Sequence, residues 1–308
     1  MKVRVRGWSH VDLMLLYIVV VWGSVFSVIK LLTAELPLDA VNGLRFVLIA
    51  AGFGVILVAR RDFRLSGRDA ALVVALGLVG FTAYQLLSSY GISLAVVAGS
   101  ALILATTPVF ATLFSGLFRV ERVGRLGWLG VAVGFAGIAV IVVGEHGLSA
   151  LRVESVAGEL AVVAGAACWA AGAVISKPLM DRHSSIKITA YSSIVGSVAY
   201  LPFLWPRMVA VDWSGAGLPA LLLILYWVLA GNVIGQLVRF YGVKRIGPHR
   251  ATAFVYLVPF SAAAIGALVL GSPVGPHHLV GGAVVFAGIA LTRAERLPVP
   301  HKPPAGAP

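Results

Sequence analysis

The sequence predicts an all-α integral membrane protein whose ten transmembrane helices form two inverted five-helix repeats. Three observations predict this fold class: the composition, the apolar stretches and an internal duplication. The 308-residue chain is 59% hydrophobic and 12% charged, with a mean hydropathy of +0.97. Because about a quarter of the residues of a soluble domain are charged, we expect this chain to lie in a lipid bilayer.

The duplication is clearest near the end of each half. GVAVGFAGIAV at 130–140 returns as GGAVVFAGIAL at 281–291, with eight of eleven positions identical at a separation of 281 − 130 = 151. The same separation relates Gln85 to Gln236 and Pro108 to Pro259, and a separation of 147 relates Trp22 to Trp169. Internal repeats in a hydrophobic chain are typical of membrane transporters.

The helices follow from the apolar stretches, because a helix needs about 20 apolar residues to cross roughly 30 Å of hydrocarbon. In chain order we place them near 12–33, 37–59, 70–93, 96–118, 124–143, 156–178, 186–205, 217–242, 249–270 and 275–293.

The basic residues test this count, because Lys and Arg collect in cytoplasmic loops. With a cytoplasmic N-terminus, only Arg152 and Arg207 fall in outer segments. The inner segments hold nineteen: Lys2, Arg4, Arg6, Arg60, Arg61, Arg64, Arg68, Arg119, Arg122, Arg125, Lys177, Arg182, Lys187, Lys244, Arg245, Arg250, Arg293, Arg296 and Lys302. These basic residues account for the net charge of +12, and on the cytoplasmic side they face anionic lipid. We therefore expect no nucleic-acid partner.

Five helices per repeat is an odd number, so the second copy must enter the membrane from the opposite side. The predicted organisation is a cytoplasmic N-terminus (1–11), a first repeat (12–145), a periplasmic linker (146–155), a second inverted repeat (156–295) and a disordered cytoplasmic tail (296–308). Such a pair places a site between the halves near the midplane, with access alternating between the two sides.

Other classes of protein have little support. The one cysteine, Cys168, lies inside a span, which excludes a disulfide framework. The apolar run after MKVRVR continues for about 22 residues without a cleavage site, so we interpret it as a first helix and not as a signal peptide. We expect no catalytic residue, cofactor or metal, because every histidine falls in a loop or at a span end: His10, His146, His183, His249, His277, His278 and His301.

These features together resemble the drug/metabolite transporter superfamily, and within it the EamA-type transporters. The resemblance covers about residues 12–295 and includes Arg45 in the second helix, the prolines of the fourth and ninth helices and the FAGIA-type motif. It implies export of small metabolites such as amino acids across the bacterial inner membrane, by a monomer or weak homodimer. Members often carry Gly-Glu after the fourth and ninth helices; Glu121 fits, whereas Ser272 replaces the second acid.

Polar and aromatic residues at mid-span depth are the candidate substrate-binding residues. A polar side chain in hydrocarbon needs a partner, so each either bonds to another helix or faces a wet cavity. They are Trp22, Asn42, Arg45, Tyr84, Gln85, Thr107, Trp169, Asn232, Gln236 and Tyr256.

Prolines and charged residues within the spans have two interpretations each. Pro108 and Pro259 in mid-span either kink their helices as gates or are merely tolerated. Arg45, about 12 Å into its helix, either anchors a packed interface or faces the translocation path. Lys30 and Arg239 lie near span ends, where we expect them to extend to the membrane interface.

Gly130 and Gly134 form a GxxxG pair, which predicts close packing of the fifth and tenth helices as a peripheral clamp that does not line the site.

No Asp or Glu occurs near the middle of any predicted span. Because exporters of lipophilic cations need a buried carboxylate, we expect a neutral to cationic cavity that favours a carboxylate-bearing or neutral substrate. A multidrug or lipophilic-cation exporter and an importer of small solutes remain the alternatives.

Overall fold

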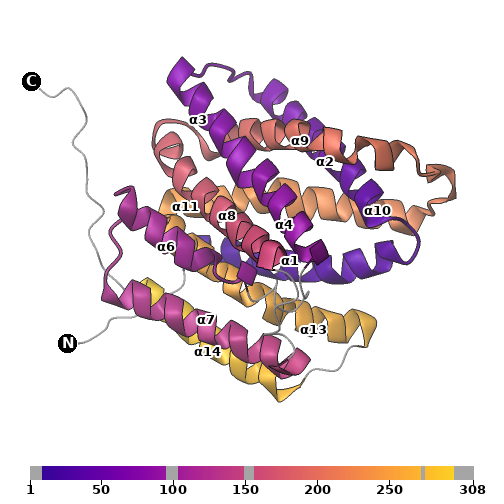
Figure 1. The fold of residues 1–308 in the computed structure, drawn as a ribbon. Helices are drawn as coiled ribbons and strands as arrows, with labels where there is room; N and C mark the ends of the chain where they lie inside the picture. The colour runs from indigo at the N-terminus through magenta and orange to yellow at the C-terminus, as the bar shows by residue number, and fades with distance from the viewer. Residues whose placement is uncertain (1–8, 95–102, 149–155, 272–274, 295–308) are drawn as a thin grey trace, which may run out of the picture.

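The computed structural model describes residues 9–94, 103–148, 156–271 and 275–294, and these residues form helices and turns without a β-strand. Helices α1 (His10–Thr33), α2 (Leu38–Arg60), α3 (Gly67–Gly77), η1 (Leu78–Ala83), α4 (Tyr84–Leu94), α6 (Thr107–Leu117) and α7 (Arg125–His146) make up the first half. The second half holds α8 (Val156–Arg182), α9 (Ser185–Val209), η3 (Trp213–Gly215), α10 (Leu218–Tyr226), η4 (Trp227–Ile234), α11 (Gly235–Ile246), α12 (Pro248–Ala253), η5 (Phe254–Leu257), α13 (Val258–Leu270) and α14 (Pro276–Ala294) (Figure 1).

Eight helical runs are long and apolar enough to cross a membrane: 10–33, 38–60, 67–94, 125–144, 156–182, 185–209, 218–246 and 248–270. Each contains one predicted span, or nearly all of it. Two shorter apolar helices, 107–117 and 276–292, lie in the remaining two predicted ranges. Residues 96–102 of the fourth predicted span, most of the predicted linker, Ser272 and the predicted tail lie outside the described residues.

Serines set the starts of three of these helices by accepting a backbone N–H with the side-chain oxygen. Ser9 and Asp12 form a reciprocal capping box at α1. Ser66 caps α3, and Ser184 caps α9. Asp12 therefore has a local structural role at the beginning of the first helix.

The two prolines lie at changes of helical structure within their predicted spans, and their role as kinks or gates stays a prediction. Pro108 is the second residue of α6, and Pro259 is the second residue of α13. A 3₁₀ segment, η5, directly precedes α13. The physical reason is that proline lacks an N–H, which the first turn of a helix does not need.

Two π-helical segments occur at equivalent places in the two halves. The range of η1, shifted by 151, becomes 229–234 and falls within η4. In a π-turn, backbone N–H groups bond five residues back, which widens the helix and is frequent at functional sites. Sequence periodicity did not reveal either segment.

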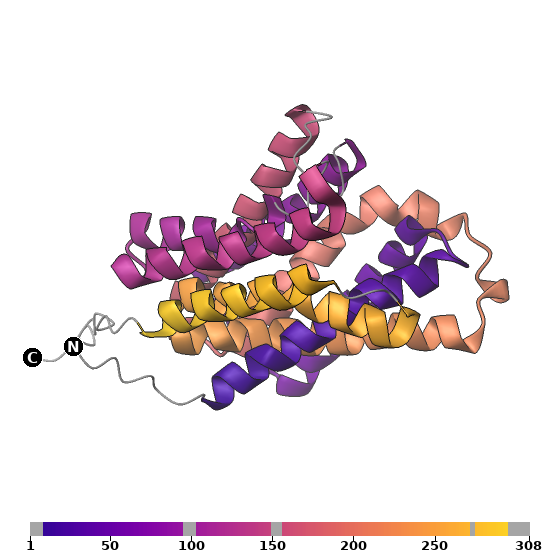
Figure 2. The same ribbon diagram turned by 90° about the horizontal axis from the view of Figure 1, so that it is seen from below.

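The helix pairs are symmetric between the two halves: replacing each helix by its counterpart in the other half gives the same set of pairs. Helix α2 packs against α9, and α7 packs against α14. Helix α1 packs against α13 just as its repeat partner α8 packs against α6, while α4–α8 corresponds to α11–α1. Figure 2 shows α14 lying alongside α7.

Glycines bring α7 and α14 into backbone contact, as predicted. A Cβ on Gly130 would lie 2.6 Å from the Gly288 carbonyl oxygen, and one on Gly288 would lie 2.5 Å from the Gly134 backbone nitrogen. Both glycines of the predicted GxxxG pair therefore contact Gly288. Further along, a Cβ on Gly137 would lie 2.7 Å from the Gly281 oxygen.

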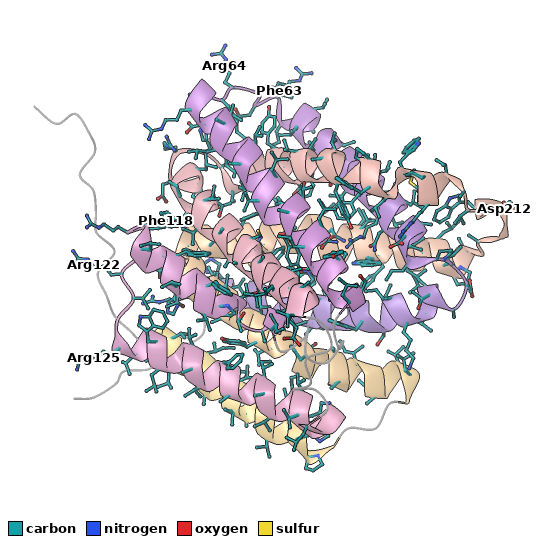
Figure 3. All side chains as sticks on the ribbon, viewed as in Figure 1. Phe63, Arg64, Phe118, Arg122, Arg125 and Asp212 are labelled. Carbon is teal, nitrogen blue, oxygen red and sulfur yellow. The ribbon has the colours of Figure 1, made fainter. Side chains whose placement is uncertain are left out.

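Basic residues gather at one end of the bundle, which we call the His10 end; the opposite end, where α1 finishes, is the Thr33 end. Lys187 pairs with Asp62 at 2.7 Å and donates to the Arg64 carbonyl. Lys244 donates to the His183 carbonyl at 3.0 Å. In Figure 3, Arg64, Arg122 and Arg125 lie far from Asp212 at the other end.

Candidate functional site

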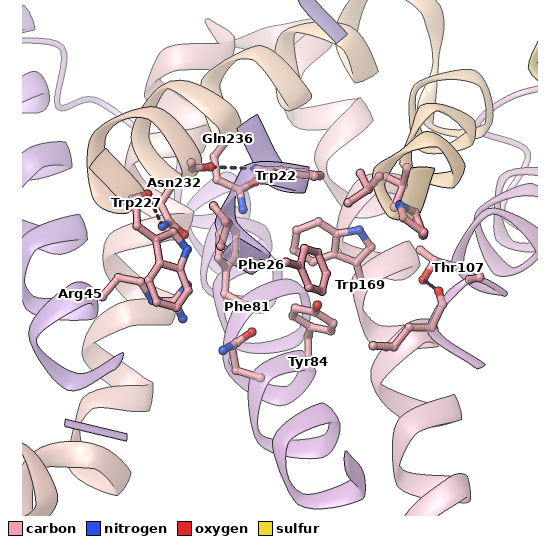
Figure 4. Close-up of a pocket in the computed structure, with 18 of the residues that line it drawn as sticks. Trp22, Phe26, Arg45, Phe81, Tyr84, Thr107, Trp169, Trp227, Asn232 and Gln236 are labelled. Atoms are coloured by element: carbon pink, nitrogen blue, oxygen red, sulfur yellow. Dashed lines mark hydrogen bonds between the residues drawn. The ribbon is translucent and has the colours of Figure 1, made fainter. Parts of the chain in front are cut away.

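A cavity of about 440 Å³ lies between the two halves of the chain. It takes residues from both repeats and from most of the long helices. Its lining is Trp22, Val25, Phe26, Arg45, Phe46, Ile49, Phe81, Tyr84, Gln85, Ile92, Leu104, Ala105, Thr107, Pro108, Ile138, Trp169, Ser193, Ser197, Trp227, Gly231, Asn232, Gln236, Val255, Tyr256, Val258 and Pro259 (Figure 4).

Nine of the ten candidate substrate-binding residues line this cavity, together with Pro108 and Pro259. Asn42 is the exception. It lies nearly one turn from Arg45 on α2, outside the lining, and its buried Oδ1 has no hydrogen-bond partner.

Three aromatic side chains form the centre of the cavity wall. The ring of Trp169 lies 4.7 Å from that of Tyr84 and 6.1 Å, edge-on, from that of Trp22. Trp22 donates from Nε1 to the Gly231 carbonyl of η4 at 2.8 Å. A Cβ on Gly235, the first residue of α11, would lie 2.9 Å from that same nitrogen, so this glycine makes room for the indole.

Arg45 is a buried cation without a polar partner in the described residues. Its side chain is 8% exposed, and its Nε has no hydrogen-bond partner. The guanidinium lies over the rings of Trp227 at 4.3 Å and Phe46 at 4.6 Å. Cation–π contact stabilises the charge but satisfies none of its N–H donors, which leaves them available to an anion at the cavity wall.

The polar groups that line the cavity differ in whether they already have a hydrogen-bond partner in the protein. Thr107 donates to the Leu104 carbonyl at 2.6 Å, and Asn232 donates to the Trp227 carbonyl at 2.8 Å. Ser193 and Ser197, one turn apart on α9, have buried hydroxyl oxygens without partners. These two hydroxyls can therefore bond to a bound solute.

Arg239 does not extend to the membrane interface, and the prediction that it would do so is wrong. Its side chain is 5% exposed, and its guanidinium lies 3.9 Å over the ring of Trp169. The reason is local: Gln236 and the Trp169 carbonyl accept its N–H groups at 3.3 and 3.4 Å. Lys30, by contrast, is exposed as expected.

Sequence reasoning missed several lining residues. In the sequence, nothing distinguishes Phe46 and Trp227 from the other apolar residues of the spans. The structure shows that the Arg45 guanidinium lies over both rings. Ser193 and Ser197 are spaced i, i+4 in the seventh predicted span, a signal for a polar helix face that could have been used. Ile138 of α7 also lines the cavity, which corrects the expectation that the α7–α14 pair stays outside the site.

The cavity lies near the middle of the helical runs. From α1 it takes residues 22–26, and from α7 residue 138, in the half nearer the Thr33 end. Ser193, Gln236 and Tyr256 lie in the half of their runs nearer the His10 end. At the His10 end the α6 and α12 segments are joined: His249 donates its backbone N–H to Glu121 at 3.2 Å, and its Nδ1 lies 2.8 Å from the Thr112 hydroxyl.

A solved crystal structure shares this fold, with a TM-score of 0.78 over 91% of this chain and 95% of the other at 19% identity. The model of the EamA-like transporter family matches residues 10–143 and again residues 156–294. The chain belongs to the EamA-like transporter family. As a member, it is a multi-pass membrane transporter with transmembrane helices and a place in the drug/metabolite transporter superfamily.

Curated relatives extend over nearly the whole transporter. The chain is 30% identical over 298 residues, 96% of each protein, to the "Probable terminal-alkyne amino-acid exporter" of Streptantibioticus cattleyicolor. It is 28% identical over 308 residues, 92% of this chain and 90% of the other, to the "Uncharacterized inner membrane transporter YedA" of Escherichia coli (strain K12).

Proposed function

We propose that this transporter exports a small amphipathic carboxylate, most plainly an amino acid with an apolar side chain. The carboxylate binds Arg45, and the apolar part lies against Trp22, Tyr84 and Trp169. The observation that carries the proposal is Arg45 itself: a buried cation at the cavity wall, supported by two rings and without a counter-charge among the described residues.

The charge of the cavity favours an anion over a cation. None of its lining residues is an Asp or Glu, so a lipophilic cation would meet a guanidinium and no carboxylate. A charge-assisted hydrogen bond contributes about 1.5–3 kcal/mol. The relative named as an amino-acid exporter is consistent with this substrate class.

Transport proceeds by rocking of two inverted five-helix repeats, 12–145 and 156–295, across ten membrane spans. Two findings support this arrangement: the family model matches the chain twice, and the helix pairs are symmetric between the two halves. With the His10 end in the cytoplasm, as the basic residues predict, the contacts that join the α6 and α12 segments lie on the cytoplasmic side of the cavity, and we infer an outward-facing conformation from them. The protein acts as a monomer or weak homodimer in the bacterial inner membrane.

Substrate counterflow in proteoliposomes tests the proposal. Liposomes preloaded with an unlabelled branched or aromatic amino acid should accumulate the labelled compound, with or without a pH gradient, because no mid-span acid is available to carry protons. Uptake of a lipophilic cation in preference to amino acids, with full activity retained in Arg45→Gln, would support the multidrug alternative.

A further inference from the structure

A second buried guanidinium lies on the other side of the aromatic centre. Arg239 of α11 contacts Trp169 but does not line the central cavity. It lines instead a smaller cavity of about 20 Å³ toward the His10 end, with Leu15, Val243 and Thr252. That volume has room for about one water molecule.

The two cavities are neighbours separated by few side chains. Trp22, Val255 and Val258 line both of them. The Trp22 indole, which donates to the Gly231 carbonyl, therefore lies in the wall that the two cavities share.

Not all N–H donors of the Arg239 guanidinium have a hydrogen-bond partner in the protein. Its Nε is buried without a partner, and its two hydrogen bonds, at 3.3 and 3.4 Å, are long for charged donors. No ion pair joins it to an acid in the described residues. A buried cation of this kind in a membrane helix marks an ion or substrate pathway more often than a packing contact.

We propose that Arg239 forms a second carboxylate-binding site, and that the substrate carboxylate moves from Arg45 past Trp22 to Arg239 as access changes sides. This inference rests on the proposed function and extends it. Tyr84 lines the central cavity together with Arg45, and its ring lies 4.7 Å from the Trp169 ring that Arg239 contacts, which places a neutral hydrogen-bonding group near the path between them. The transfer keeps the carboxylate near a positive charge while the central cavity closes.

The test compares Arg239→Gln with Arg45→Gln, using one apolar amino acid and its primary amide. Arg245→Gln is the matched control, since Arg245 lies on the same helix over the Tyr241 ring but is exposed. We expect Arg45→Gln to weaken equilibrium binding of the acid. Arg239→Gln should leave that binding within about twofold of wild type and lower counterflow of the acid, relative to the amide, by about tenfold or more.

Arg239→Lys guards against a folding defect, because it retains the charge but loses the forked donor geometry. Its acid-to-amide counterflow ratio should fall between wild type and Arg239→Gln. Wild-type ratios in both Arg239 variants would overturn the second site and leave the proposed function standing. Loss of equilibrium binding in Arg239→Gln equal to that in Arg45→Gln would also overturn it, since one shared site would then suffice. Absence of acid counterflow in the wild type would instead refute the proposed function.

Discussion

At the scale of single residues, the cavity wall presents polar atoms that the protein leaves unbonded. Arg45, Ser193 and Ser197 all have buried atoms without partners and all line the cavity. Leaving a buried donor or acceptor unpaired costs about 1–3 kcal/mol, and a ligand that supplies the partner recovers that free energy. The pattern fits a binding site better than a packed core.

The two serines give the first prediction. Ser193→Ala/Ser197→Ala should weaken substrate binding by about 5- to 150-fold, since the two lost hydrogen bonds together contribute about 1–3 kcal/mol. Thermal stability should not fall, because neither hydroxyl has a partner in the protein and each is costly to bury unpaired. Ser115→Ala is the control: its oxygen is also buried and unpartnered but lies outside the cavity lining. Equal effects of the double variant and the control on binding would contradict the assignment.

Sequence reasoning found most of the polar lining because polar groups in apolar spans are few. It failed where the answer depended on rotamers and neighbours. Arg239 is close enough to a span end to reach the interface, yet Gln236 and Trp169 hold it inside. Asn42 lies nearly one turn from Arg45, nearer the start of α2, and the part of that helix that lines the cavity begins at Arg45.

At the scale of elements, α7 and α14 are held together by backbone contact at glycines. Gly137→Ala should therefore destabilise the protein: its Cβ would lie 2.7 Å from the Gly281 oxygen and the helices must separate. Overpacking typically costs about 1–3 kcal/mol. Gly54→Ala is the control, with no atom within 4 Å of the added Cβ. A melting temperature for Gly137→Ala equal to that of Gly54→Ala would show that the contact is not tight.

The prolines at the starts of α6 and α13 give a prediction about access. Pro108→Ala and Pro259→Ala should fold, because alanine is compatible with a helix start. Each should bias the equilibrium between the two access states, and the two should act in opposite directions if the repeats are inverted. Cysteine accessibility from each side, compared with transport rate, measures the bias. Wild-type values in both variants would reduce the prolines to packing features.

Element positions were predictable where hydrophobicity alone sets them, as for α1, α2 and α9. The π-helical segments η1 and η4 and the break at η5 were not, because they depend on which backbone groups find partners across helices. The Gly231 carbonyl that receives Trp22 is an example. Once one of the two π-helical segments is known, the repeat separation of 151 residues gives the position of the other.

At the scale of the whole molecule, the orientation in the membrane decides which side the cavity faces. In a Cys168→Ser background, Arg64→Cys should be protected from an impermeant thiol reagent in intact spheroplasts, and Asp212→Cys should react. Both positions are exposed and lie at opposite ends of the bundle (Figure 3). Reaction at position 64 with protection at 212 would reverse the orientation and with it the direction that the cavity faces.

The proposed function depends most on the pairing of a substrate carboxylate with Arg45. Equilibrium binding of one apolar amino acid and of its primary amide, to wild type and to Arg45→Gln, measures that pairing directly. The acid should bind the variant about tenfold or more weaker, while the amide binds both proteins within about twofold. Stability should not fall, because removing a buried unpaired charge also removes its desolvation cost. Arg60→Gln, at the exposed end of the same helix, should behave as wild type. Equal affinity of Arg45→Gln and wild type for the acid, or an equal loss for acid and amide, would contradict the account.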